Sequence, residues 1–71
     1  MIDREVALEI QRSALDAVVK LSSILNDIQG RCPDEDFEII KKGVGYSIGD
    51  IYVEILNHLY SQHPDIDHTQ K

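Results

Sequence analysis

Three side chains that could bind a metal ion or a small ligand recur at a spacing of four in the second half of the chain. These are Asp50, Glu54 and His58, and the spacing places them along one edge of a helix. Dinuclear sites in helical bundles pair a Glu with a His three residues later and take further carboxylates from facing helices. Here the first half of the chain supplies no inward acidic residue. We therefore expect an exposed helix edge with no metal ion and no cofactor, and keep a metal- or ligand-binding bundle as the alternative function.

Cys32 is the only cysteine, which excludes an intrachain disulfide and favours a reducing, cytoplasmic setting. It stands beside Pro33, close to an expected helix start, where thiols can become reactive. No second cysteine or histidine base is near it in the sequence. The chain also lacks a phosphate-binding glycine loop and a nucleophile–base pair. We expect no enzyme activity.

The charge balance narrows the class of partner. Seven Lys and Arg residues stand against thirteen Asp and Glu residues, for a net charge of -6. Nucleic-acid binding needs clustered basic residues, and here they are scattered, so we expect no nucleic-acid partner. The longest uncharged stretch, from Ile55 to Pro64, is shorter than the ~20 apolar residues of a membrane span. The chain also begins with charged residues rather than a signal peptide. We expect a soluble protein whose acidity would suit a basic protein partner.

Two long segments with helical periodicity flank one turn. In the first, over about residues 3–29, apolar residues alternate at spacings of three and four, as in a heptad seam. This seam consists of Ala7, Ile10, Ala14, Ala17, Leu21, Ile24 and Ile28. Gly30 and Pro33 predict a turn over 30–33, followed by a second helix over about 34–62. The fold predicted is an all-α antiparallel helical hairpin with a flexible tail over 63–71.

The second helix has a possible interruption. Gly43-Val44-Gly45 could kink or break it, because glycine is unfavourable inside a helix. The tyrosine and β-branched residues that follow also have strand propensity, although the helical period continues through them. A continuous helix is the interpretation that we prefer.

The second helix is apolar on more than one side, which predicts an intermolecular contact. One face should pack on the first helix and includes Ile55 but not Leu56. A single neighbouring helix cannot cover the remaining apolar face, and a 71-residue chain without disulfides has a small core. We therefore predict a homodimer that forms a four-helix bundle. The predicted dimer or partner interface comprises Gly45, Tyr46, Gly49, Tyr52, Val53, Leu56 and Tyr60.

These observations predict a function in outline only. The chain is expected to be a small acidic homodimeric helical protein that acts through protein–protein interaction. It would serve as an adaptor, as a regulator or as a neutralising partner of a basic protein.

Overall fold

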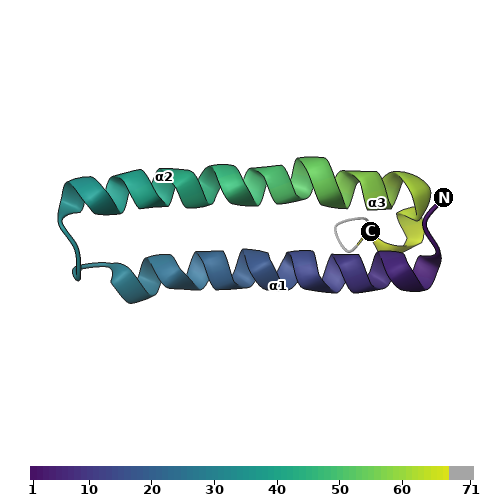
Figure 1. Ribbon diagram of the computed structural model, residues 1–71, viewed down its shortest axis with the longest axis horizontal. Coiled ribbons are helices and arrows are strands. Elements are labelled where there is room, and N and C mark those ends of the chain that lie inside the picture. Colours follow the sequence, from purple (N-terminus) through teal and green to yellow (C-terminus); the bar gives the residue numbers. More distant parts are fainter. Residues whose placement is uncertain (68–71) are drawn as a thin grey trace.

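The computed structural model describes residues 1–67, and they form two long antiparallel helical arms that lie side by side (Figure 1). The first arm is helix α1, Arg4–Ile28. The second arm is made of α2 (Asp34–Asp50), the π-helical turn η1 (Ile51–Leu56) and α3 (Asn57–Gln62), and the short 3₁₀ helix η2 (Pro64–Ile66) follows it. The described residues contain no β-strand. The predicted all-α helical hairpin is confirmed.

The turn between the arms follows from the residues at 30–36. Gly30 adopts a φ of +81°, in the left-handed region that residues with a Cβ avoid, and it ends the first arm. Pro33 directly precedes α2, where a missing backbone N–H is harmless. Three carboxylates then fall in the first turn of α2, where the helix dipole favours negative charge. They are Asp34, Glu35 and Asp36.

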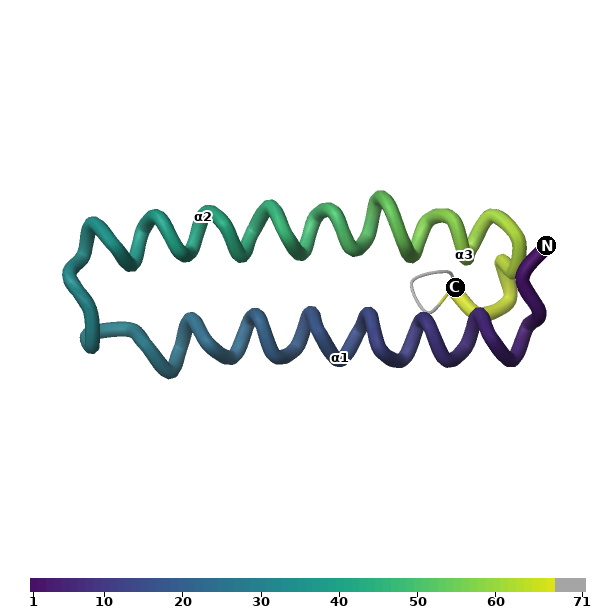
Figure 2. Tube along the Cα trace, viewed as in Figure 1, coloured from purple at the N-terminus to yellow at the C-terminus, as the bar shows by residue number. Residues whose placement is uncertain are grey.

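The second arm departs from α-helical geometry at η1, and not at residues 43–45, where the sequence suggested a kink. Helix α2 continues through residues 43–45 without a break, and the departure from α-helical geometry comes at η1. There the backbone N–H of Asn57 bonds to the carbonyl of Tyr52, five residues back instead of four. The Cα trace shows that the two arms nevertheless lie side by side along their length (Figure 2).

The π-helical turn changes which side chains face α1. An uninterrupted α-helix would turn Ile55 inward and Leu56 outward, which is what the sequence periodicity predicts. In the structure Leu56 is completely buried, whereas Ile55 is 40% exposed. The inward register therefore shifts by one residue at η1, and this shift corrects the prediction for both positions.

The hydrophobic core lies at the end of the hairpin where the first half of α1 packs against η1, α3 and η2. Alanines from α1 face two fully buried leucines from the second arm, so that large side chains fill the space left by small ones. The cluster consists of Ala7, Ala14, Leu56, Leu59 and Ile66. Toward the turn, Val44 is the buried residue of α2. The resulting molecule is elongated, with extents of 45 × 22 × 16 Å.

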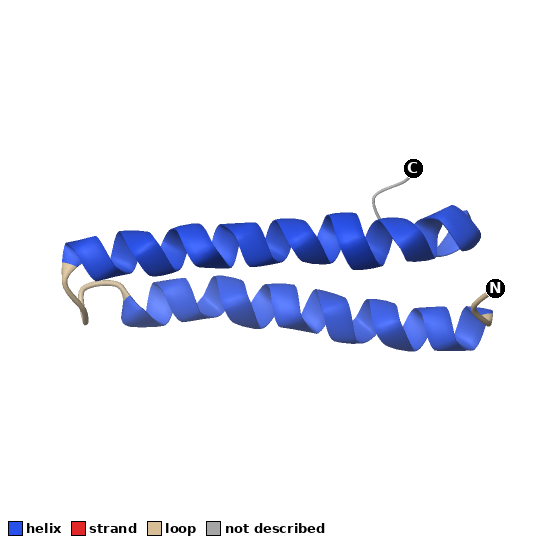
Figure 3. Ribbon diagram, turned by 45° about the horizontal axis from the view of Figure 1, so that its top comes forward, coloured by secondary structure: helices blue, strands red, loops and turns tan. Residues whose placement is uncertain are grey.

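The C-terminal segment, residues 63–67, packs against α1, contrary to the expectation of a flexible tail from residue 63. The chain turns back at the end of the second arm (Figures 1 and 3). The side chain of Ile66 belongs to the core. The apolar side chain of Ile66, two residues after Pro64, gives this otherwise polar segment a group to bury. The rest of the predicted tail, residues 68–71, lies outside the described residues.

Candidate functional site

The three candidate metal ligands lie on the exposed surface of the second arm. Within residues 1–67, no group of three or more His, Cys, Asp or Glu side chains is arranged to hold a metal ion, so Asp50, Glu54 and His58 do not form such a group. The ring Nε2 of His58 instead lies 3.3 Å from the side-chain amide nitrogen of Gln62. All three side chains are exposed. The protomer alone does not assemble a metal site from them.

Cys32 lies in the turn and is half-buried. Its Sγ is 3.9 Å from the carbonyl oxygen of Ile28, a distance typical of a weak sulfur contact. Within residues 1–67, Cys32 belongs to no group of three or more His, Cys, Asp or Glu side chains that could hold a metal ion. No polar or charged side chain among residues 1–67 is buried, so every group in this range that could do chemistry lies at the surface.

The predicted interface does not form one surface, because the π-helical turn divides it. Leu56 belongs to the core, and Tyr52 and Tyr60 pack against that core. The other predicted residues face solvent on α2 and η1. These exposed members are Gly45, Tyr46, Gly49 and Val53. Leu56 is therefore not part of the exposed surface. Residues 1–67 expose two separate apolar surfaces.

The first surface is a groove between the two arms, which we call the interhelical groove. It has a volume of about 450 Å³ and is open to solvent along one side of the hairpin. Its floor and walls are apolar, and its polar groups come from Glu9 and Ser13 of α1. The groove is lined by Glu9, Ile10, Ser13, Ala14, Ala17, Ile51 and Ile55. A face made from both helices is the kind of surface that a bundle buries in its centre.

The second surface lies on the second arm, opposite the buried Val44, and we call it the outer face of α2; its last residue, Val53, belongs to η1. Ile39, Tyr46 and Val53 are 60–70% exposed and recur at intervals of seven, so they share one side of the helix. Gly49 lies between the last two, and a Cβ built on it meets nothing within 4 Å. The ammonium of Lys42 lies 5.9 Å from the ring centroid of Tyr46, within the range of a cation–π contact.

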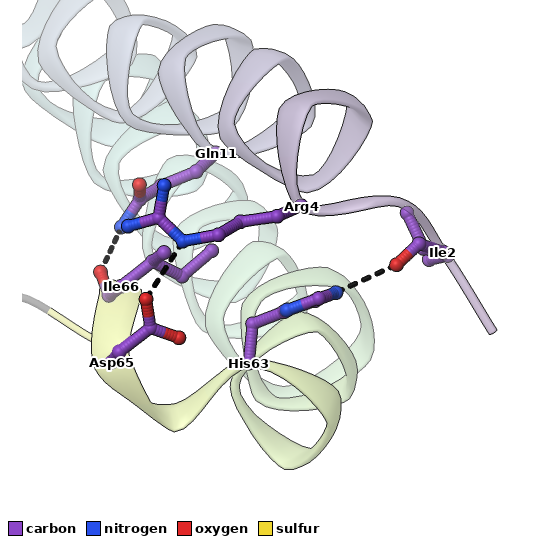
Figure 4. Close-up of polar contacts among 6 residues, drawn as sticks. All are labelled: Ile2, Arg4, Gln11, His63, Asp65 and Ile66. Atoms are coloured by element: carbon purple, nitrogen blue, oxygen red, sulfur yellow. Dashed lines mark hydrogen bonds and ion pairs between the residues drawn. The ribbon is translucent and has the colours of Figure 1, made fainter.

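Polar contacts fasten the C-terminal segment to the start of α1 (Figure 4). The guanidinium Nε of Arg4 donates to Asp65 Oδ2 at 2.8 Å, and the amide of Gln11 donates to the carbonyl of Ile66 at 2.7 Å. His63 Nε2 lies 2.6 Å from the carbonyl oxygen of Ile2. The same Gln11 amide is 3.0 Å from the hydroxyl of Tyr60. These contacts close the side of the hairpin that carries Tyr60.

Acid should weaken the attachment of the C-terminal segment through Asp65. The hydrogen bond from Arg4 is the largest cause that lowers the pKa of Asp65 below its ordinary value of 3.8. A carboxyl with a lower pKa in the folded protein stabilises it above the unfolded pKa, and this contribution is lost as the pH falls through the folded value. We expect Asp65→Asn to reduce amide-exchange protection at Ile66 and Asp67 near neutral pH. Once the pH lies below the lowered folded pKa of Asp65, the carboxyl is protonated in the parent and the variant and the parent should be alike.

The control for this prediction is Asp16→Asn. Asp16 pairs with Lys20 at 3.2 Å on the exposed surface of α1, away from the C-terminal segment. Its loss should leave protection at Ile66 unchanged at every pH. A pH-independent difference between Asp65→Asn and the parent would show that the carboxylate charge is not what holds the segment.

The sequence predicted some of the groove residues as apolar positions but did not predict the groove. Ile10, Ala14 and Ala17 belong to the predicted seam of the first helix, but the interface predicted from the sequence included no residue of that helix. The signal was present in the width of the apolar stripe: further apolar residues beside the heptad seam make the stripe wider than one neighbouring helix can cover.

None of the helices within residues 1–67 combines the length and the apolar character that a bilayer-spanning segment requires.

Comparison of the chain with protein-family models, with curated proteins and with solved structures finds no match. Its function is therefore inferred from the two exposed surfaces.

Proposed function

We propose that this chain is one half of a homodimeric four-helix bundle and that it acts through protein–protein contact, as an adaptor, a regulator or a neutralising partner of a basic protein. The observation that carries the proposal is the interhelical groove, an open apolar face to which both arms contribute. A second hairpin placed over this face would supply the two further helices of a bundle.

The apolar face extends beyond the groove toward the turn. Ile10, Ala17 and Ile24 are seven residues apart and lie on one side of α1. On the second arm, Ile40 and Ile51 are eleven residues apart, close to three whole helical turns. Ile24 and Ile40 are both exposed in the protomer. Two-fold packing would bury these side chains against their equivalents from a second copy.

The surface area of the protomer supports the same proposal. The chain exposes 5307 Å², whereas a compact monomer of 8.1 kDa is expected to expose roughly 4,500 Å². The excess is about 800 Å², which is close to the area that each partner contributes to an interface of standard size. The radius of gyration, 14.8 Å, likewise exceeds the ~11 Å expected for a compact domain of this length.

Self-association also suits the small core. Among residues 1–67, only two large side chains, Leu56 and Leu59, are almost fully buried. A single core in a domain below about 70–80 residues rarely supplies more than about 3–5 kcal/mol, and this chain has no disulfide to add to it. Burial of the groove in a dimer would add the stability that the isolated hairpin lacks.

Coupling between folding and association predicts that the melting temperature depends on protein concentration. Because association stabilises only the folded chain, the melting temperature should rise steadily as the protomer concentration is increased about 100-fold. Circular dichroism at a series of concentrations measures it. A melting temperature that stays constant across the series would contradict the homodimer.

A further inference from the structure

The outer face of α2 would remain uncovered in the proposed bundle. Val44 is buried beneath α1, and Tyr46, two residues later, points about 200° around the helix from it. The groove is lined by Ile51 and Ile55 of the same arm, on the side that adjoins α1. The outer face is therefore free to contact a different molecule.

The dimensions of this face match those of a helix. From Ile39 to Val53 it spans fourteen residues, or about 21 Å along the axis. Its large side chains recur at seven, the interval at which a packed helix presents its own apolar residues. Gly49 leaves open space at its Cβ position although glycine costs about 1 kcal/mol relative to alanine inside a helix. No contact among the described residues accounts for that glycine, whereas close approach of a second backbone would.

The charges around the outer face are mostly negative. Residues 34–56 carry six carboxylates and two lysines, and all eight of these side chains are exposed. The two ion pairs found in the described part of the chain, Arg4–Asp65 and Lys20–Asp16, use none of them. Asp50 is four residues after Tyr46 and three before Val53, so it borders both on the helix surface. Glu35 and Asp36 border Ile39 in the same way at the other end.

We propose that the outer face of α2 binds a basic amphipathic helix of another protein. The apolar seam of that helix would pack along Ile39, Tyr46 and Val53, and its Lys and Arg residues would lie toward the carboxylates at both ends of the face. The proposal rests on a function in protein–protein contact but does not require self-association through the groove.

A helix fits this surface better than an extended peptide does. Extended peptides gain affinity by adding a strand to the edge of a sheet, and residues 1–67 contain no strand. A helix satisfies its own backbone hydrogen bonds and needs only an apolar stripe to bind. The opposite charges at its flanks would speed association and fix its register.

Two synthetic helical peptides test the proposal. Both carry the same leucine seam at heptad spacing, and they differ in having either lysine or glutamate at the flanking positions. Fluorescence anisotropy with the full chain should show that the lysine peptide binds at least about 10-fold more tightly. This preference should shrink as salt is added. Equal affinity for the two peptides, or binding of neither, would overturn the proposal.

Matched variants locate the binding surface. Gly49→Leu places a large side chain in the middle of the outer face and should weaken binding of the lysine peptide about 10-fold, the effect of losing ~1.4 kcal/mol. Ser23→Leu adds the same side chain to an exposed position of α1 and should leave the affinity unchanged. Gly49→Leu is not expected to unfold the chain, since nothing lies within 4 Å of the new Cβ and leucine favours helices. Unchanged peptide binding by Gly49→Leu would contradict the assignment.

Measurements of self-association distinguish the partner site on the outer face from the proposed homodimer. Sedimentation of Gly49→Leu should show the same self-association as the parent. If this variant loses self-association, the outer face binds a second copy of the chain and the proposed partner is wrong. If the parent proves monomeric but still prefers the lysine peptide, the homodimer fails while the partner site stands.

Discussion

Replacing Leu56 by alanine is expected to unfold most of the protein at room temperature, whereas replacing its neighbour Ile55 is expected to have a small effect in dilute solution. Leu56 is completely buried between the arms, and Ile55 is 40% exposed at the groove. Truncation of a buried leucine to alanine costs about 2–5 kcal/mol, which is most of the stability that a core of this size supplies. Urea unfolding followed by circular dichroism measures both losses.

The comparison between the two neighbours tests the π-helical turn itself. A regular α-helix through residues 51–56 would bury Ile55 and expose Leu56, so it predicts the opposite order of effects. A larger loss of stability for Ile55→Ala than for Leu56→Ala in dilute solution would therefore contradict a register in which Leu56 faces α1. The measurement needs low protein concentration, because Ile55 would become buried in a dimer.

The sequence contained most of the fold but not this register. Periodicity, Gly30 and Pro33 were sufficient to predict two antiparallel helices and the turn between them, because each of these signals acts within a few residues. The π-helical turn shifts the inward face by a single position among consecutive apolar residues, Ile51 to Leu56. Ile55 and Leu56 are both apolar, so the hydrophobic pattern alone cannot show which of the two side chains faces α1. The packing of Leu56 against Ala7 and Ala14 of α1 decides between them.

Introducing a charge into the groove is expected to abolish self-association. Ala17 lines the groove and is half-buried in the protomer, and glutamate is a good helix former, so Ala17→Glu should preserve α1. In a dimer the new carboxylate would be buried without a partner, at a cost of several kcal/mol. The dissociation constant should rise at least about 100-fold. Analytical ultracentrifugation measures this change.

Val19→Glu provides the matched control for the groove variant. It adds the same charge two residues away, at an exposed position of α1 that does not line the groove. Surface substitutions of this kind usually change stability by less than about 0.5 kcal/mol, so self-association should change by no more than about twofold. If Ala17→Glu and Val19→Glu changed the dissociation constant equally, the groove would not be the dimer interface.

The candidate surfaces could be predicted only in part. The excess of apolar residues on the second helix was evident from its sequence, as was the exposed position of Tyr46 and Val53. The groove could not be placed, since its residues come from both arms and their alignment depends on how the arms pack. The attachment of the C-terminal segment was also missed. It depends on Arg4 and Gln11, about 60 and 55 residues before their partners, and local patterns carry no information about such distant pairs.

Intermolecular nuclear Overhauser effects give the most direct test that the hairpins pair through the groove. The sample mixes isotope-labelled and unlabelled chains, so that only contacts between two copies are detected. The groove interface predicts contacts from the methyl groups of Ile10, Ile51 and Ile55 to the other copy. Contacts from Val53 with none from these three isoleucines, or no contacts between copies at all, would contradict it.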